Sequence, residues 1–222
     1  MWYQRGSLLI VLLTAGCSTA ATSADRRVDT LPFYQDATFA PQWLEPGAVP
    51  ADFHQIPAFR LTNHRGESVD ESLLDGKISV VDFFFTTCRG ICPKLRKSMV
   101  RVDAAMEADA DVVLLSHSVM PSKDTVEVLS DYAQTNGITS KRWHLLTGDR
   151  DQIYALGRSS YFVEDDQGEV VDKVDFLHTE SMILLDGRRR IRGVYNGVNA
   201  ASVDQLILDA KALLTEANPA SN

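Results

Sequence analysis

The feature that most constrains the fold is the almost uninterrupted apolar run over Ile78–Phe85. A run of this length is too short for a typical helix and is characteristic of a strand buried on both faces, which requires helices above and below the sheet. A second such run covers Val112–Ser116, and a helical pattern that opens at Pro93 lies between them. The sequence therefore predicts two central parallel strands joined by a crossover helix in an α/β protein.

The rest of the body alternates strand and helix signals in the same way, and Asp186-Gly187 between two apolar runs is a hairpin signal. Further strands are expected at Phe59–Thr62, Arg142–Leu146, Met182–Leu185 and Ile191–Tyr195. Four helices are expected: from Pro93 to about Glu107, over Lys123–Asn136 with Ser122 as the cap, from the cap Asp149 to Gly157, and from the cap Ser202 to Glu216. This order predicts a thioredoxin-like fold, with a mixed sheet flanked by helices, an N-terminal extension, and a β-hairpin insertion between Gly157 and His178.

The first 17 residues resemble a bacterial lipoprotein signal, because Arg5 and an apolar stretch precede small residues and Cys17. A lipid on Cys17 would hold the domain at the cell envelope, in the periplasm or extracytoplasmic space. A conventional cleaved signal and an uncleaved anchor are the alternatives, and all three place the body outside the cytoplasm. Residues 18–30 are small and polar and predict a flexible tether, and 31–218 form the expected domain. The aromatic residues of 30–50 predict an arm lying on that domain.

The chain carries a formal charge of −8 with a sequence pI near 5.1. No long basic run is present, so binding to nucleic acid is not expected. Three cysteines are too few for a disulfide-stapled scaffold, and two of them, Cys88 and Cys92, form a close pair. The chemistry of the chain is therefore expected at this pair.

Cys88 and Cys92 lie in a turn that joins the buried strand to the next helix. Pro93 fixes the start of that helix, and Gly90 is expected to let the turn close, so that both sulfurs face one region. The helix amides and Arg89 are expected to favour thiolates. A pair of thiolates selects Cu(I), zinc or an iron–sulfur cluster over hard ions such as magnesium.

A third ligand is sought among the five histidines. His178 is the strongest candidate, because it stands just before a strand whose entry loop passes the cysteine turn in this architecture. His117 ends a central strand and is a possible substitute or supporting ligand. His54 and His64 are expected at the surface, and His144 is expected to have a packed or half-exposed ring within its strand.

Four strings of the chain closely resemble the Sco/SenC family over roughly residues 41–215: FFFTTCRGICPKL, SHSVMPSKDTVEVLSDYA, KRWHLLTGDRDQIY and DFLHTESMILLDGRRRIRGVYNG. The resemblance implies that Cys88, Cys92 and His178 bind one copper ion, as Cu(I) or Cu(II). It also implies delivery to the dinuclear copper centre of cytochrome c oxidase, with an oxidase subunit or a periplasmic copper carrier as the partner. Arg89 stands where many members have proline and Met120 where aspartate is common, so neither takes a family role. Met120 could lend a thioether to Cu(I), but packing is the expected role.

Two other interpretations stay open. Cys88 and Cys92 could be the redox pair of a thiol-disulfide oxidoreductase that keeps partner cysteines reduced, or they could form a structural disulfide. Three features favour copper: three residues separate the thiols, no proline occurs between Pro121 and Pro219, and His178 supplies an imidazole that disulfide exchange does not need. A bridge across so short a loop would stabilise the fold little.

Overall fold

The computed structural model describes residues 30–163 and 179–217. Contacts divide the chain after Thr30, and the larger compact unit begins at Leu31. The predicted signal, Cys17, the tether and His178 lie outside the described residues, as does most of the predicted hairpin insertion. Within the described ranges, no helix combines the length and apolar character needed to cross a membrane.

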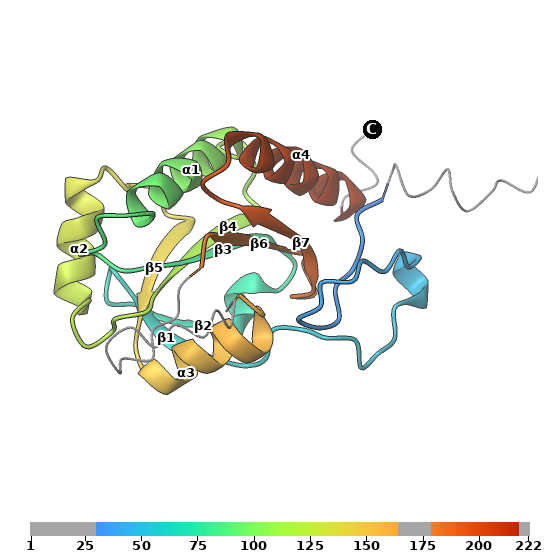
Figure 1. The fold of residues 1–222 in the computed structure, drawn as a ribbon, viewed down its shortest axis with the longest axis horizontal. Helices are drawn as coiled ribbons and strands as arrows, with labels where there is room; N and C mark the ends of the chain where they lie inside the picture. Colours follow the sequence, from blue (N-terminus) through green and yellow to red (C-terminus); the bar gives the residue numbers. More distant parts are fainter. Residues whose placement is uncertain (1–29, 164–178, 218–222) are drawn as a thin grey trace, which may run out of the picture. The chain divides into compact units, whose positions relative to one another are not determined.

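The core of the fold is one seven-stranded sheet in the order β2-β1-β5-β4-β3-β6-β7 (Figure 1). Strands β3, β4 and β5 are parallel, and all the other neighbours are antiparallel. The strands are β1 (Arg60–Asn63), β2 (Ser68–Asp70), β3 (Ile78–Phe84), β4 (Val112–Ser118), β5 (Trp143–Thr147), β6 (Ser181–Leu185) and β7 (Ile191–Asn196). The mixed sheet flanked by helices, with two central parallel strands, is as the sequence predicts.

Helices cover both faces of the sheet (Figure 1). They are α1 (Cys92–Ala105), α2 (Val126–Thr135), α3 (Arg150–Ala155) and α4 (Ala200–Ala217). Residues of α1, α2 and α4 pack into one hydrophobic core, and residues of α3 pack into a second core on the opposite face. The sheet is therefore the middle of three layers.

Strand β3 contributes to both cores, and all its residues are buried. Val80 and Phe84 join the core under α1, whereas Val81 and Phe83 join the core on the α3 face. Side chains alternate between faces along a strand, so a strand buried on both sides is mostly apolar on both faces, and Ser79 and Asp82 are the exceptions in β3. The continuous run in the sequence is thus confirmed as the central strand.

Several predicted boundaries differ from the structure. The short strand β2 has no counterpart in the prediction, because three residues with one buried side chain give no pattern to detect. Helix α2 begins later than expected, with Thr125 rather than Ser122 as the cap that accepts from the Val128 amide. Asp149 caps α3 as predicted, and a π-helical turn at Leu156–Ser160 extends it.

The last helix also starts earlier than predicted. Ser202 lies inside α4 and not at its cap, since its amide donates to the side-chain oxygen of Asn199 at 3.1 Å. The hairpin predicted at Asp186-Gly187 is confirmed, with β6 and β7 pairing on either side of it.

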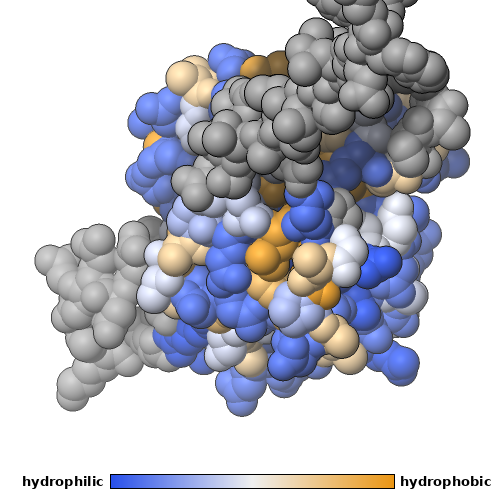
Figure 2. Space-filling view, turned by 90° about the vertical axis from the view of Figure 1, so that its right-hand side faces the viewer, coloured by the Kyte–Doolittle hydropathy of each residue, from blue (hydrophilic) through white to orange (hydrophobic). Residues whose placement is uncertain are grey.

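The segment after Leu31 forms an arm on the sheet, as predicted. Phe33 is 1% exposed, and it pairs with Gln42 through two backbone hydrogen bonds. The guanidinium of Arg192, from β7, lies 3.9 Å from the Phe33 ring centroid and donates to the carbonyls of Leu31 and Pro32. The face on this side of the molecule is mostly hydrophilic, with a small hydrophobic area near its middle (Figure 2).

Candidate metal and thiol site

The two cysteines lie where β3 passes into α1, at the carboxyl end of the central strand. The amide of Cys88 donates to the carbonyl of Phe85 at 3.2 Å, which closes the first part of the turn. Cys92 is the first residue of α1, and Pro93 follows it in the first helical turn, as predicted. Both thiols are free; Cys88 is partly exposed, whereas Cys92 is 5% exposed.

A buried carboxylate holds the start of this turn. Asp124, which is 1% exposed, accepts hydrogen bonds from the amide of Thr86 at 3.1 Å and from its hydroxyl at 2.5 Å. It also accepts from the hydroxyl of Ser118, the last residue of β4, at 2.5 Å. Three donors on one carboxylate therefore join the cysteine turn to the end of the neighbouring strand.

The pKa values of the two thiols are shifted in opposite directions. Burial acts to raise the pKa of Cys88, but hydrogen bonds from the Cys92 thiol and from the backbone amides of Cys92, Gly90 and Ile91 outweigh it, and the pKa is lowered. Burial is also the main cause that raises the pKa of Cys92, and the hydrogen bond to Cys88 adds to it. The expectation of two thiolates is thus wrong for Cys92, because burial disfavours the charged form of its sulfur.

The cap at the start of α1 is a sulfur atom. Ile91 occupies the N-cap position without a side-chain hydrogen bond, and the amides near it donate to Cys88 instead. Arg89 is not among the groups that shift either thiol pKa, so its expected contribution is not seen. Gly90 has no positive φ and a Cβ there would meet open space, so the turn does not depend on this glycine.

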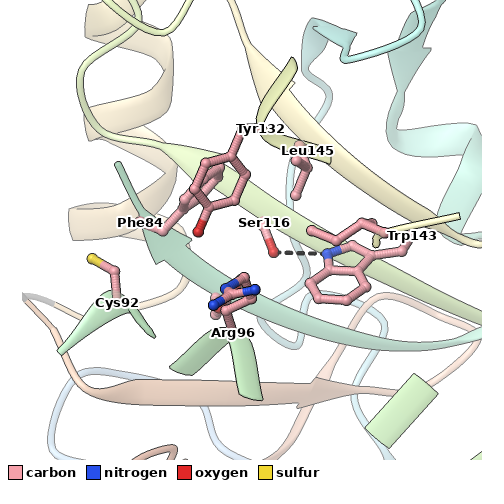
Figure 3. Close-up of a pocket in the computed structure, with 9 residues that line it drawn as sticks. Phe84, Cys92, Arg96, Ser116, Tyr132, Trp143 and Leu145 are labelled. Atoms are coloured by element: carbon pink, nitrogen blue, oxygen red, sulfur yellow. Dashed lines mark hydrogen bonds between the residues drawn. The ribbon is translucent and has the colours of Figure 1, made fainter. Parts of the chain in front are cut away.

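A small pocket lies beside Cys92 between the sheet, α1 and α2 (Figure 3). Its space is about that of one water molecule. Tyr132 and Arg96 face the pocket, and the indole of Trp143 donates to the Ser116 hydroxyl at 3.0 Å. Asp82 also lines it; burial raises the pKa of this carboxyl to about 7, against a hydrogen bond from Ser116. Within the part of the chain that the structure describes, one carboxyl oxygen of Asp82 has no hydrogen-bond partner.

The structure separates most of the candidate histidines from the cysteines. His117 is fully buried on the α3 face, stacked on Phe83 at 5.0 Å between ring centroids, and neither ring nitrogen has a hydrogen-bond partner among the described residues. Its backbone is near the cysteine turn as predicted, but its side chain points away, since side chains alternate along β4. A ligand role for His117 is therefore wrong.

The other described histidines take structural positions. The prediction that His64 lies at the surface is wrong, since the residue is 7% exposed. Its ring Nδ1 accepts a hydrogen bond from the Leu145 amide at 3.2 Å, which holds the ring in the interior. His144 packs as predicted and contacts Asn63 and Arg65. His54 is half-buried, with its ring nitrogen 2.7 Å from the carbonyl of Ser160.

The described ranges thus hold two of the three expected copper ligands, Cys88 and Cys92, and contain no group of three or more metal-ligating side chains. Met120 packs against the core on the α3 face, as its packing interpretation predicts. Two residues were missed by the sequence analysis, Asp82 and Asp124. The signal for Asp82 was available, since it is the only charged residue in its apolar run.

The chain is similar to known proteins over most of its length. The family model described as SCO1/SenC matches residues 49–215. The chain is 30% identical over 166 residues to the SCO1 protein homolog of Bacillus subtilis, which covers 73% of this chain and 84% of that protein.

Solved structures give the same result. A SCO1/SenC family lipoprotein from Bacillus anthracis is 28% identical, with a TM-score of 0.64 over 72% of this chain and 95% of that one. BsSco, described as a Sco family cytochrome c oxidase assembly protein with a disulfide switch, is 28% identical, with a TM-score of 0.62 over 73% and 94%. ScoI of Bradyrhizobium japonicum with copper bound is 26% identical, with a TM-score of 0.57 over 71% and 98%. These likenesses confirm the predicted thioredoxin-like fold.

Proposed function

The chain belongs to the SCO1/SenC family, and on that premise we propose that it carries one copper ion as cargo for the assembly of cytochrome c oxidase. Cys88, Cys92 and His178 are the proposed ligands of Cu(I) or Cu(II), and the dinuclear copper centre of the oxidase is the proposed destination. The observation that supports this most is the pair of free thiols at the carboxyl end of β3. The copper-bound relative from Bradyrhizobium supports the choice of metal.

The two thiols suit copper that must be taken up and passed on. Thiolates are soft donors that bind Cu(I) well, and a low-coordinate site allows one ligand to be exchanged at a time. Cys92 is held in the packed start of α1, whereas Cys88 is partly exposed and can meet an incoming donor. Coordination of the copper ion by the Cys92 thiolate would offset the burial that raises the pKa of this thiol.

Strand pairing supports His178 as the third ligand. Strand β6 runs antiparallel to β3, with Val81 opposite Ile183, so the first residue of β6, Ser181, lies toward the end of β3 from which the cysteine turn leaves. His178 precedes Ser181 by three residues, a chain length that spans at most about 10 Å. A ligand at position 178 could therefore reach that end of the sheet, which supports the proposed role of His178.

Competition for Cu(I) against a chelator of known affinity tests this function. The Cys17→Ser chain, whose only thiols are Cys88 and Cys92, is expected to bind one equivalent tightly. Cys88→Ser and Cys92→Ser should each abolish tight binding, and His178→Ala should leave a weaker dithiolate site. His54→Gln is the matched histidine control and should bind as the parent does. Equal affinity in the parent and all three ligand variants would refute the ligand set.

Thiol-disulfide exchange is a second candidate function, and the unequal thiols favour it. The Cys88 thiolate would attack a partner disulfide and release one partner thiolate, forming a mixed disulfide. Cys92, once deprotonated, would attack the Cys88 sulfur, which leaves an intramolecular disulfide and a fully reduced partner. The disulfide switch reported for BsSco supports a redox change at this pair.

The two functions are separable by experiment. If the reduced protein binds copper weakly in every variant but reduces a protein disulfide at a rate that falls on Cys88→Ser, exchange replaces copper delivery as the function. Tight copper binding with no disulfide reduction supports delivery alone.

We also propose that Cys17 carries the lipid that anchors the domain at the cell envelope. The similar chain from Bacillus anthracis is described as a lipoprotein, which supports this proposal. Cys17→Ser should release the chain from the membrane fraction without changing its copper stoichiometry. Retention of the variant in the membrane fraction would contradict lipidation at this residue.

A further inference from the structure

We propose that the surface around Cys88 docks a protein partner that presents carboxylates around its own copper- or thiol-bearing site. This inference rests on the proposed function, since it concerns how the partner of that same site is recognised. It is carried by the charge of one segment of the chain and by where the structure places those charges.

The segment that holds the cysteines is basic in an acidic protein. Phe83–Val102 contains five lysine or arginine residues and no aspartate or glutamate. The rest of the chain holds 17 basic and 30 acidic residues, so the segment is net positive whereas the rest of the chain is net negative. The five residues are Arg89, Lys94, Arg96, Lys97 and Arg101.

Three of these side chains form what we call the basic rim: Arg89, Lys94 and Lys97. All three are exposed, Arg89 next to Cys88 in the turn and the two lysines on the first two turns of α1. Among the described residues, no carboxylate pairs with any of the three. By contrast, Arg101 pairs with Asp204 of α4.

The centre of this surface differs from its rim. Cys88, Ile91 and Pro93 are partly exposed, and Cys88 and Ile91 pack against the core beneath them. An apolar centre surrounded by a charged border is the usual anatomy of a protein interface. The sulfur through which cargo or electrons would pass thus lies inside the border.

The basic rim favours a protein over a membrane as its occupant. A lipid surface resting on the rim would cover Cys88 and keep other donor atoms from reaching it. A protein with an acidic border can bring its own sulfur or imidazole donors to Cys88, and unpaired cations attract it over about one Debye length, roughly 8 Å at physiological ionic strength. Complementary charges of this kind act mainly on the association rate and are weakened by salt.

A first experiment tests the electrostatic potential around Cys88 by comparing how fast a charged and a neutral thiol reagent react with it. In the Cys17→Ser/Cys92→Ser chain, Cys88 is the only thiol and reacts with the dianionic dithiobis(nitrobenzoate) or with neutral dithiodipyridine. Lys94→Glu/Lys97→Glu should slow the dianionic reagent about fivefold or more at low salt and leave the neutral reagent nearly unchanged. Lys141→Glu/Lys211→Glu changes the net charge equally at two exposed lysines outside the rim and should slow neither. An equal effect of the two double variants would overturn the proposal.

A second experiment measures docking to a protein. The copper-loaded Cys17→Ser chain is mixed with the purified soluble copper-receiving domain of the oxidase from the same cell, and the rate of copper transfer is followed at low and high salt. The rim variant Lys94→Glu/Lys97→Glu should transfer copper at least fivefold more slowly at low salt, with the difference lost at high salt. The control variant should match the parent.

The outcomes separate this inference from the proposed function. If the parent binds no copper, the proposed function fails. If the parent and the rim variant bind one equivalent equally but transfer it at equal, salt-independent rates, the docking surface is refuted and copper carriage stands. Binding to vesicles of anionic lipid that needs the rim, without any rim effect on transfer, would assign the surface to the membrane and overturn the proposal.

Discussion

Asp124 accepts hydrogen bonds from both the amide and the hydroxyl of Thr86, two residues before Cys88. Asp124→Ala should unpair these donors and that of Ser118, and we expect a loss of about 2–4 kcal/mol in the free energy of unfolding. Copper affinity should fall as well, because the turn loses its link to β4. Urea denaturation and chelator competition measure the two effects.

Asp131→Ala, at an exposed position of α2, is the control and should change stability by less than about 0.5 kcal/mol. Asp124→Asn should fall between the parent and Asp124→Ala, since an amide oxygen can still accept from part of the set. If Asp124→Ala unfolds as the control does, the carboxylate does not hold the turn.

His117 should make stability depend on pH at the acid side. Burial lowers the pKa of His117 to about 3, so between that value and its ordinary 6.5 the unfolded chain binds a proton that the folded chain does not. Stability therefore rises with pH through this window, by at most about 1.4 kcal/mol per pH unit from this residue. His117→Phe should remove that contribution, because the ring contacts Phe83, Phe59 and Tyr161, and no charged group in residues 30–163 or 179–217 shifts its pKa.

Urea unfolding of the parent and His117→Phe at pH 4, 5, 6 and 7 checks this sign. The variant should gain relative to the parent as the pH falls. Asp82, whose pKa is raised to about 7, contributes in the opposite direction in both proteins and cancels in the comparison. Parallel pH profiles would contradict the assignment.

The two thiols should differ in reactivity. In a Cys17→Ser background, Cys88 of the Cys92→Ser chain should react with iodoacetamide at least about tenfold faster at pH 7 than Cys92 of the Cys88→Ser chain. The reason is that Cys88 is partly exposed with a lowered pKa, whereas Cys92 is buried with a raised one. In strong denaturant the two rates should converge, and equal rates in the folded state would be incompatible with this geometry.

Arg192 should stabilise the fold through its buried contacts. Its side chain is 2% exposed and pairs with Glu216 at 3.2 Å and with Asp186 at 3.5 Å. Arg192→Met should lower the free energy of unfolding by about 2–4 kcal/mol, because two arm carbonyls and Glu216 lose their donor. It should also expose the segment after Leu31 to limited proteolysis. Arg188→Met, which alters a nearby side chain on the hairpin loop, should do neither.

Much of the fold follows from the sequence because its central elements are long and fully buried. The apolar run of β3 and the hairpin signal at Asp186-Gly187 are both confirmed. Strand β2 could not be predicted, since it has only three residues and is defined by its pairing with β1 rather than by a pattern of its own. Cap residues were predicted less well, because more than one polar residue near a helix start could serve, as Ser122 and Thr125 could before α2.

The site was predicted in part. The positions of Cys88 and Cys92 at a strand-to-helix turn follow from the apolar run and Pro93. The opposite pKa shifts of the two thiols do not, since they depend on burial and on which sulfur the amides reach. Nor does the side of the sheet that His117 faces, because one residue of register moves a side chain from one core to the other. His178 stays a prediction.

Arg192 links the start of the arm to β7 and α4. Its guanidinium holds the carbonyls of Leu31 and Pro32 while pairing with the end of α4, so tension arriving along the preceding chain is shared between β7 and that helix. Strand β7 is separated from β3 by β6. A pull on the chain before Leu31 would therefore act first on the edge strand β7, two strands away from the β3 end that carries Cys88 and Cys92.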